Sequence, residues 1–217
     1  MAYGGGAFLP NENATVTGTW TFTSPPTFGS TSSGSGAVGS VPSAVAATVF
    51  VSEQSFGFLH QTTLTLAALP LTLSDTHVGG GVKIYTFPEG NITMLGATAS
   101  VAETTTSTIL TTLNGGKTLS VGLGSVQTVA QDSGTLVTTE QDILNAFAPV
   151  SSTVINVAAA AATGSLSATT CIKYDGTATA QAVYFNCGVP TATDIDADAT
   201  TTWRGTIVLT WVYNGDV

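Results

Sequence analysis

Apolar and polar residues alternate over the last segment of the chain, TTTWRGTIVLTWVYNGDV at residues 200–217. Its large apolar residues Trp203, Ile207, Leu209 and Trp211 all stand at odd positions. A period of two is the repeat of a strand with two distinct faces, and Thr, Val, Ile and Trp suit a pleated sheet. The segment therefore predicts a long strand that closes a sheet. Trp203 and Trp211 share one side of this strand, which favours a place in the core over a role as a ligand platform.

Shorter segments with strand character follow one another from residue 45 onward. They cover residues 47–51, 62–73, 82–87, 91–101, 104–113, 117–129, 150–162, 171–174 and 178–189. Turn residues separate several of them, and the turns at Asn114–Gly116 and Asp175–Gly176 predict hairpins. Pro70 predicts a bend or an edge position, because proline donates no hydrogen bond to a sheet. The spacing of strands and turns predicts an all-β sandwich of jelly-roll or Greek-key type.

One segment has the pattern of a short helix. Thr138 is the expected N-cap, Gln141 completes a capping box, and Glu140 and Asp142 place negative charge in the first turn. Pro149 ends the predicted helix. The apolar face of this helix is expected to comprise Ile143, Leu144 and Phe147.

Residues 1–45 differ from the rest, because they are rich in Gly, Ser and Pro and too poor in large apolar residues to form a core. One piece, ATVTGTWTFT at residues 14–23, has strand character. A disordered leader and an extended arm that becomes ordered against a neighbour are both consistent with this composition. We favour the arm, because exposed aromatic side chains are costly in water. The predicted division is an arm at 1–45 and a sandwich at 46–217, with partner contacts from Phe8, Val16, Trp20, Phe22 and Phe28.

Charged residues make up 8% of the chain, against about 25% in an average soluble domain. A neutral, hydroxyl-rich surface favours a protein packed against copies of itself or within a larger assembly. A secreted β protein with a threonine-rich exterior is the alternative. The net charge is −9, and the four cations Lys83, Lys117, Lys173 and Arg204 are scattered. This pattern argues against nucleic-acid binding.

The first residues lack the basic and apolar regions of a signal peptide, so none is expected. No membrane span is expected either, because Pro149 and three hydroxyl residues interrupt the longest apolar region. Cys171 and Cys187 lie on neighbouring strand-like segments and could face each other. Without a secretory signal, two reduced thiols are favoured over a disulfide.

The sequence offers little catalytic chemistry. His60 and His77 have no metal-ligand spacing, which favours surface or turn positions for both. Nucleophile and phosphate-loop motifs are missing from the sequence. The carboxylates stand mostly in turns and sugar-binding aromatic rows are few, which argues against the paired acids of a glycosidase. We therefore expect a protein that is not an enzyme and has no cofactor.

One acidic loop is a candidate metal site. Asp194, Asp196 and Asp198 alternate along it and can share a hard cation such as Ca²⁺. The loop lacks the following glycine and the terminal glutamate of a typical calcium loop. A solvated acidic loop therefore stays open as the alternative.

Three stretches resemble virion structural proteins of tailed bacteriophages. They are KIYTFPEGNITMLG at residues 83–96, VYFNCGVP at 183–190 followed by WRGTIVLTW at 203–211, and TVTGTWTFTSPPTFG at 15–29. The resemblance implies a capsid decoration, or cement, protein on the outer surface of the virion, made in the cytoplasm of the bacterial host.

Such proteins are often homotrimeric β-sandwiches that bind the major capsid protein, and their arms reach over neighbouring capsomers. The resemblance implies no catalytic residues. A tail-fibre or head–tail adaptor component involved in host attachment is the alternative. Repeats or a coiled coil would favour a fibre, and the sequence has neither.

Overall fold

The computed structural model describes residues 39–56, 58–74, 79–103, 119–128, 135–147, 156–158, 171–189 and 198–215. In chain order the elements are η1 (Ser43–Val45), β1 (Val49–Phe56), β2 (Leu59–Leu73), β3 (Gly79–Thr86), β4 (Gly90–Glu103), β5 (Ser120–Gly124), η2 (Thr138–Glu140), β6 (Leu144–Phe147), β7 (Asn156–Ala158), β8 (Ile172–Gly176), β9 (Ala182–Gly188) and β10 (Ala199–Gly215). Both η elements are single turns of 3₁₀ helix. Neither helix in these described ranges is long or apolar enough to cross a membrane.

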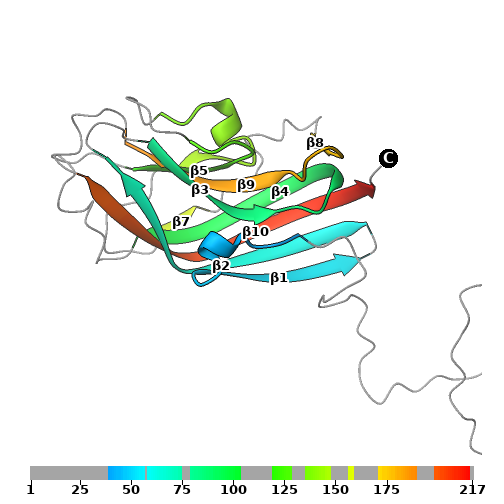
Figure 1. The fold of residues 1–217 in the computed structure, drawn as a ribbon, viewed down its shortest axis with the longest axis horizontal. Coiled ribbons are helices and arrows are strands. Elements are labelled where there is room, and N and C mark those ends of the chain that lie inside the picture. The colour runs from blue at the N-terminus through cyan, green and yellow to red at the C-terminus, as the bar shows by residue number, and fades with distance from the viewer. Residues whose placement is uncertain are drawn as a thin grey trace, which may run out of the picture.

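The strands form two antiparallel sheets that pack face to face (Figure 1). One sheet has the order β1-β2-β10-β4-β7, with β8 also paired to β4, and the other has the order β3-β9-β5-β6. The pairs β2·β10, β3·β9, β4·β8 and β5·β6 make the chain one long hairpin with β5 and β6 at its tip. Winding of this hairpin places β10 beside β4 and β9 beside β5. This arrangement is a jelly roll, so the predicted all-β sandwich is confirmed.

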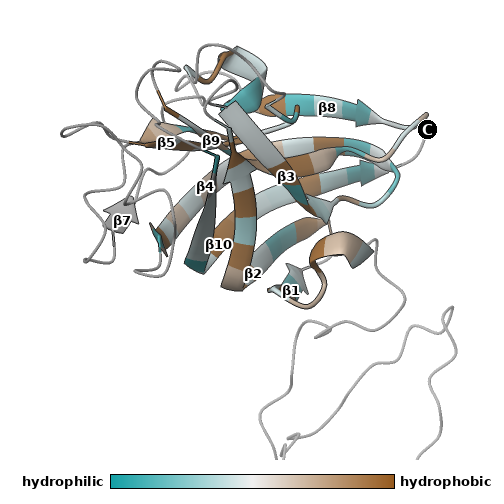
Figure 2. Ribbon diagram, turned by 60° about the vertical axis from the view of Figure 1, so that its left-hand side comes forward, coloured by the Kyte–Doolittle hydropathy of each residue, from teal (hydrophilic) through white to brown (hydrophobic). Residues whose placement is uncertain are grey.

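The core lies between the sheets and follows from the period of two along each strand. On β2, Leu64 and Leu66 face inward and Thr63 and Thr65 face outward, and Figure 2 shows the resulting bands of apolar and polar residues on β2, β10 and β4. Trp203 and Trp211 of β10 are fully buried, which confirms their predicted place in the core. β10 is central rather than at an edge, because it pairs with β2 on one side and β4 on the other.

The predicted edge position of Pro70 in β2 is confirmed, and a hydrogen bond fixes the turn after β3. β1 pairs with β2 only as far as Leu66, so Pro70 lies where one side of β2 is open. The Pro88–Gly90 turn joins β3 to β4, and Gly90 adopts a φ of 126°. The Tyr213 hydroxyl donates a 2.9 Å hydrogen bond to the Glu89 carbonyl oxygen and so fixes this turn against β10.

The predicted short helix at residues 138–148 is confirmed only in its first turn, and its predicted continuation to Pro149 is wrong. The 3₁₀ turn covers only Thr138–Glu140, and Leu144 then lies in β6, opposite Leu123 of β5. Glu140 rather than Gln141 caps the turn, since its carboxylate accepts a 2.8 Å hydrogen bond from the Val137 N–H group. The Gln141 side chain instead accepts from the Ala146 N–H group and donates to a carbonyl oxygen before the turn. Pairing with β5 therefore prevails over the local helix signal.

The predicted hairpin at Asp175–Gly176 is also wrong, because β8 pairs with β4 whereas β9 pairs with β3 and β5. Burial explains the separation. β9 has buried residues on both faces and suits the middle of a sheet, whereas exposed and half-buried positions alternate through most of β8, as in an edge strand. The turn therefore passes from one sheet to the other.

Several predictions lie outside the described residues. Among them are the strand at 104–113, the turn at 114–116, His77 and the arm contacts Phe8, Val16, Trp20, Phe22 and Phe28. The described chain begins at Gly39, and Ser40 already pairs with Thr86 of β3.

Gly205 marks an irregularity in the middle of the six-stranded sheet. Its φ is 135°, and a Cβ atom there would lie 2.1 Å from the Ser100 carbonyl oxygen of β4. Ala67 and Ala68 of β2 face the single residue Arg204 at the same place, which forms a β-bulge.

We expect Gly205→Ala to lower the free energy of unfolding by about 1–3 kcal/mol or more. Alanine is strained at this φ, and its Cβ atom must displace the β4 backbone. Gly96→Ala is the matched control, since a Cβ atom there meets nothing within 4 Å. Urea unfolding of the two variants checks the prediction. Equal stability of both would contradict it.

A candidate interface on the six-stranded sheet

The outer face of β1, β2, β10 and β4 in the six-stranded sheet is almost free of charge. Cross-strand neighbours form rows of uncharged side chains, for example Phe50, Thr65, Thr206 and Ser100 from β1, β2, β10 and β4. The next row along continues this pattern with Ser52, Thr63, Val208 and Thr98. Arg204 is the only charged side chain that faces outward on the described parts of these four strands. We call these outward positions the neutral face. The low charge and high hydroxyl content of the chain are therefore concentrated on this surface.

A shallow depression of about 360 Å³ lies at the β-bulge beside Arg204. Its lining consists of Thr65, Leu66, Ala67, Ala102, Arg204, Gly205 and Thr206. Arg204 is exposed here and has no ion-pair partner in the part of the chain that the structure describes. The neutral face therefore offers one positively charged position next to a hollow.

Loops cover part of the outside of the four-stranded sheet. Asn186 of β9 points outward yet is fully buried, because its amide holds two loops against the sheet. Its Oδ1 atom accepts a hydrogen bond from the Thr128 N–H group at 2.9 Å, and its Nδ2 atom donates to the Val126 and Glu140 carbonyl oxygens. Among the residues that the structure describes, the six-stranded sheet thus presents the more open face.

The loop after β5 is also fixed by Asp142. The carboxylate accepts 2.7 Å hydrogen bonds from the N–H group and the hydroxyl of Ser125. Burial raises the pKa of Asp142 above its usual 3.8, although the Ser125 hydrogen bonds lower it. The folded chain therefore binds this proton more tightly than the unfolded chain does.

The stability that Asp142 contributes is fully present below pH 3.8 and is lost as the pH rises through the raised pKa. Asp142→Asn removes this loss and keeps an oxygen acceptor for Ser125. We therefore expect the free energy of unfolding of the variant, relative to the wild type, to increase from about pH 3 to about pH 7.

Asp175→Asn is the opposite control, because hydrogen bonds from Thr177 lower the pKa of the exposed Asp175. Its stability relative to the wild type should fall over the same pH range. Chemical unfolding at several pH values measures both trends. Parallel trends in the two variants would contradict the assignment.

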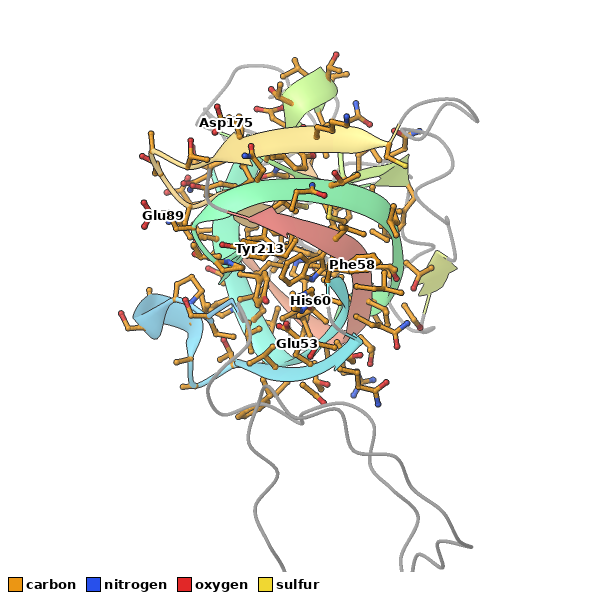
Figure 3. The ribbon with its side chains drawn as sticks, turned by 90° about the vertical axis from the view of Figure 1, so that its right-hand side faces the viewer. Glu53, Phe58, His60, Glu89, Asp175 and Tyr213 are labelled. Carbon is orange, nitrogen blue, oxygen red and sulfur yellow. The ribbon has the colours of Figure 1, made fainter. Side chains whose placement is uncertain are left out.

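A buried polar cluster fixes β1 to the rest of the sandwich. The carboxylate of Glu53 accepts a hydrogen bond from the Tyr85 hydroxyl at 2.7 Å and from the Thr62 hydroxyl at 3.3 Å. His60 Nδ1 lies 2.9 Å from the other carboxylate oxygen. A carboxylate only accepts hydrogen bonds, so His60 donates from this nitrogen. Figure 3 shows Glu53 and His60 close together on β1 and β2.

The cluster continues into both sheets. Trp211 of β10 donates from its indole nitrogen to the Thr62 hydroxyl at 2.8 Å, and its ring stacks on His60 at 4.0 Å between centroids. Tyr85 of β3 accepts a 3.0 Å hydrogen bond from the Gly39 N–H group. Burial, followed by the negative charge of Glu53, raises the pKa of Tyr85 well above its usual range. Both Glu53 carboxylate oxygens and the Tyr85 and Thr62 hydroxyls have partners inside the protein, so the cluster is suited to holding strands together rather than to catalysis.

The prediction of a surface or turn position for His60 is therefore wrong, because only 2% of its surface is exposed. No motif marks this cluster in the sequence. The alternation along β2 could have indicated the burial of His60, because His60, Leu64 and Leu66 all stand at even positions and face inward. That alternation places His60 on the core side of β2, where a polar ring requires a partner.

Of the predicted calcium ligands, Asp198 is exposed just before β10, and Asp194 and Asp196 lie outside the described residues. The described ranges contain no group of three His, Cys, Asp or Glu side chains that could hold a metal ion. The calcium site stays a prediction.

Neither cysteine is in a disulfide bond. Cys171 is exposed, and Cys187 is buried in β9, where burial raises the pKa of the thiol.

Comparison of the chain with protein-family models, curated proteins and solved structures found no match. The fold and the geometry of the neutral face are therefore the basis for any statement about function.

Tyr85→Phe removes one donor to Glu53 and the acceptor of the Gly39 N–H group. We expect the free energy of unfolding to fall by about 1–3 kcal/mol, because the buried Glu53 carboxylate and the half-buried Gly39 N–H group each lose a partner. Tyr184→Phe, on the neighbouring strand β9 and outside the cluster, is the control and should change stability little. Urea unfolding distinguishes the two, and a loss at Tyr184 equal to that at Tyr85 would count against the cluster.

Proposed function

We propose that the chain is a structural protein of a bacteriophage virion. In this proposal it binds the outside of the capsid as a homotrimer, contacts the major capsid protein, and bridges neighbouring capsomers as a decoration, or cement, protein. The observation that carries the proposal is the neutral face, a broad surface with a single outward charge on four neighbouring strands.

The chemistry of this face supports protein contact. Threonine has a stiff, β-branched side chain, so it loses little conformational entropy when a partner covers it. Its hydroxyl can form hydrogen bonds across an interface. A face of lysine and glutamate would instead require desolvation of charges on every contact.

The distribution of acidic residues also supports packing. The chain carries a net charge of −9, which opposes close approach of identical copies. Among the described residues, the exposed acids Glu89, Asp175 and Asp198 lie in the turn before β4, at the end of β8 and before β10, outside the neutral face. These acids therefore do not oppose contact of the neutral face with a partner.

Binding to assembled heads tests the proposal. Purified full-length chain is added to phage heads that lack it, and the heads are sedimented. We expect the chain to sediment with the heads and to raise the temperature at which they release DNA, because a ligand of the assembled state stabilises that state. The proposal is refuted if the chain stays in the supernatant at every concentration. Recovery with tails instead of heads would favour the fibre or adaptor alternative.

Two threonine variants locate the contact. Thr65 is exposed in the middle of the neutral face, and Thr179 is exposed in the loop between β8 and β9. Thr65→Lys should weaken binding to heads by about tenfold or more, because it places an unpaired charge in the interface. Thr179→Lys is the matched control and should bind like the wild type. Equal binding by both variants would exclude the neutral face as the contact surface.

A further inference from the structure

The six-stranded sheet ends at β1, an eight-residue strand that pairs only with β2 among the described residues. An edge strand directs alternate N–H and C=O groups outward, where another strand can pair with them. Proteins usually block such an edge with charges, short strands or covering segments. The described sheet edges differ sharply in this protection.

The other edges each have a protective feature. β3 carries the exposed Lys83 and pairs with Ser40, β8 carries the exposed Lys173 and Asp175, and β6 and β7 have only four and three residues. β1 has none of these features, because its one charged residue, Glu53, points inward and is buried. Phe50 and Val51 on β1 are instead 54% and 43% exposed. β1 therefore presents a long, uncharged and partly apolar edge.

Residues 14–23, ATVTGTWTFT, have the pattern of a strand of this same sheet. Even positions include Val16, Trp20 and Phe22, and every odd position from 15 to 23 is threonine. β2 has the same alternation of threonine and large apolar residues around Leu64. A strand with this pattern beside β1 would extend the core over Val51 and extend the neutral face with threonine.

The connecting segment can reach well beyond its own sandwich. Residues 24–38 span at most about 50 Å when extended, which is far more than the roughly 4.8 Å between paired strands. Pro25 and Pro26 come two and three residues after the strand-like piece, and consecutive prolines favour an extended, stiff path. The chain enters the described fold at Gly39, beside Tyr85 of β3 on the other sheet.

We infer that residues 14–23 of one chain bind as an added strand along the open edge of β1 in a neighbouring copy. The inference rests on the proposed function, because it supplies the link between subunits of the same assembly. Backbone hydrogen bonds provide affinity, and the alternation of side chains fixes the register.

Two valine variants test the edge in the purified full-length chain. Val51 and Val126 are 43% and 47% exposed, and Val126 lies in the loop after β5. Val51→Lys should weaken self-association by about tenfold or more, because a lysine on the edge opposes strand pairing. Val126→Lys should associate like the wild type. Sedimentation velocity over a concentration series measures the change, and circular dichroism confirms that both variants are folded.

The fluorescence emission of Trp20 provides a second measurement on the same variants. Trp203 and Trp211 are already buried, so a shift in tryptophan emission reports mainly on Trp20. Emission should move to longer wavelength in Val51→Lys and stay unchanged in Val126→Lys. A monomeric wild type, or equal association and emission in both variants, overturns the inference.

Disulfide trapping identifies which chain donates the strand. One set of chains carries Thr17→Cys, Thr19→Cys or Thr21→Cys, to cover the registers on one face, and a second set carries Ser52→Cys on β1. All carry Cys171→Ser to remove the exposed thiol. Mixing the two sets under mild oxidation should give dimers that contain one chain of each kind. Thr98→Cys, exposed on β4 of the same face and away from the edge, should give none.

A bond formed only within single chains that carry both cysteines would overturn pairing with a neighbour. Equal trapping at Thr98→Cys would do the same. The two proposals can fail separately. Equal self-association of Val51→Lys and the wild type, with both proteins still bound to heads, refutes strand exchange and leaves the proposed function standing. Edge-dependent self-association without binding to heads refutes the proposed function alone.

Discussion

The buried carboxylate of Glu53 is the constraint on which the open edge of the sandwich depends. A carboxylate removed from water is stable only when donors surround it, and three side chains from β2 and β3 supply them. β1 is otherwise a peripheral strand, held by its ladder with β2 and by the burial of Val49. The cluster therefore holds an exposed edge in a fixed position, because the same carboxylate binds donors from both sheets. A loosely held edge would present its backbone groups in no constant direction.

The two sheets of the jelly roll have different outer environments, and polar side chains account for the difference. Asn186 uses a buried amide and Asp142 a half-buried carboxylate to hold loops against the outside of the four-stranded sheet. The four long strands of the other sheet carry threonine, serine and glutamine there, which need no internal partner because they can bond to water or to another protein. In the part of the chain that the structure describes, loops complete one face, and the other face is left available.

The parts of the structure that follow from period two were predictable from the sequence. β10 and the inward places of Trp203 and Trp211 depend only on the alternation of residues that lie next to one another. The failures occurred where a distant strand prevailed over a local pattern. Leu144 pairs with β5 instead of continuing a helix, and the Asp175–Gly176 turn leads into another sheet because β9 is buried on both faces. Composition predicted a neutral surface, but its location required the register of four strands. His60 contacts Glu53 and stacks on Trp211. The stack could not be predicted, because Trp211 lies far from His60 in the sequence.

The central position of β10 has a consequence for how the chain folds. Thr62 and Trp211 form one hydrogen bond although 149 residues separate them, and Thr201 bonds to Leu71 across 130 residues. Among the described strands, β2 and β4 are joined only through β10, so the six-stranded sheet cannot form until residues 199–215 have left the ribosome. Until then β2 and β4 each lack a partner on the side that β10 will occupy, and their leucine and isoleucine side chains have no closed core. Pairing over such long loops is slow, and unpaired strands are prone to aggregate. The strand that completes the fold therefore also sets how long the nascent chain requires protection.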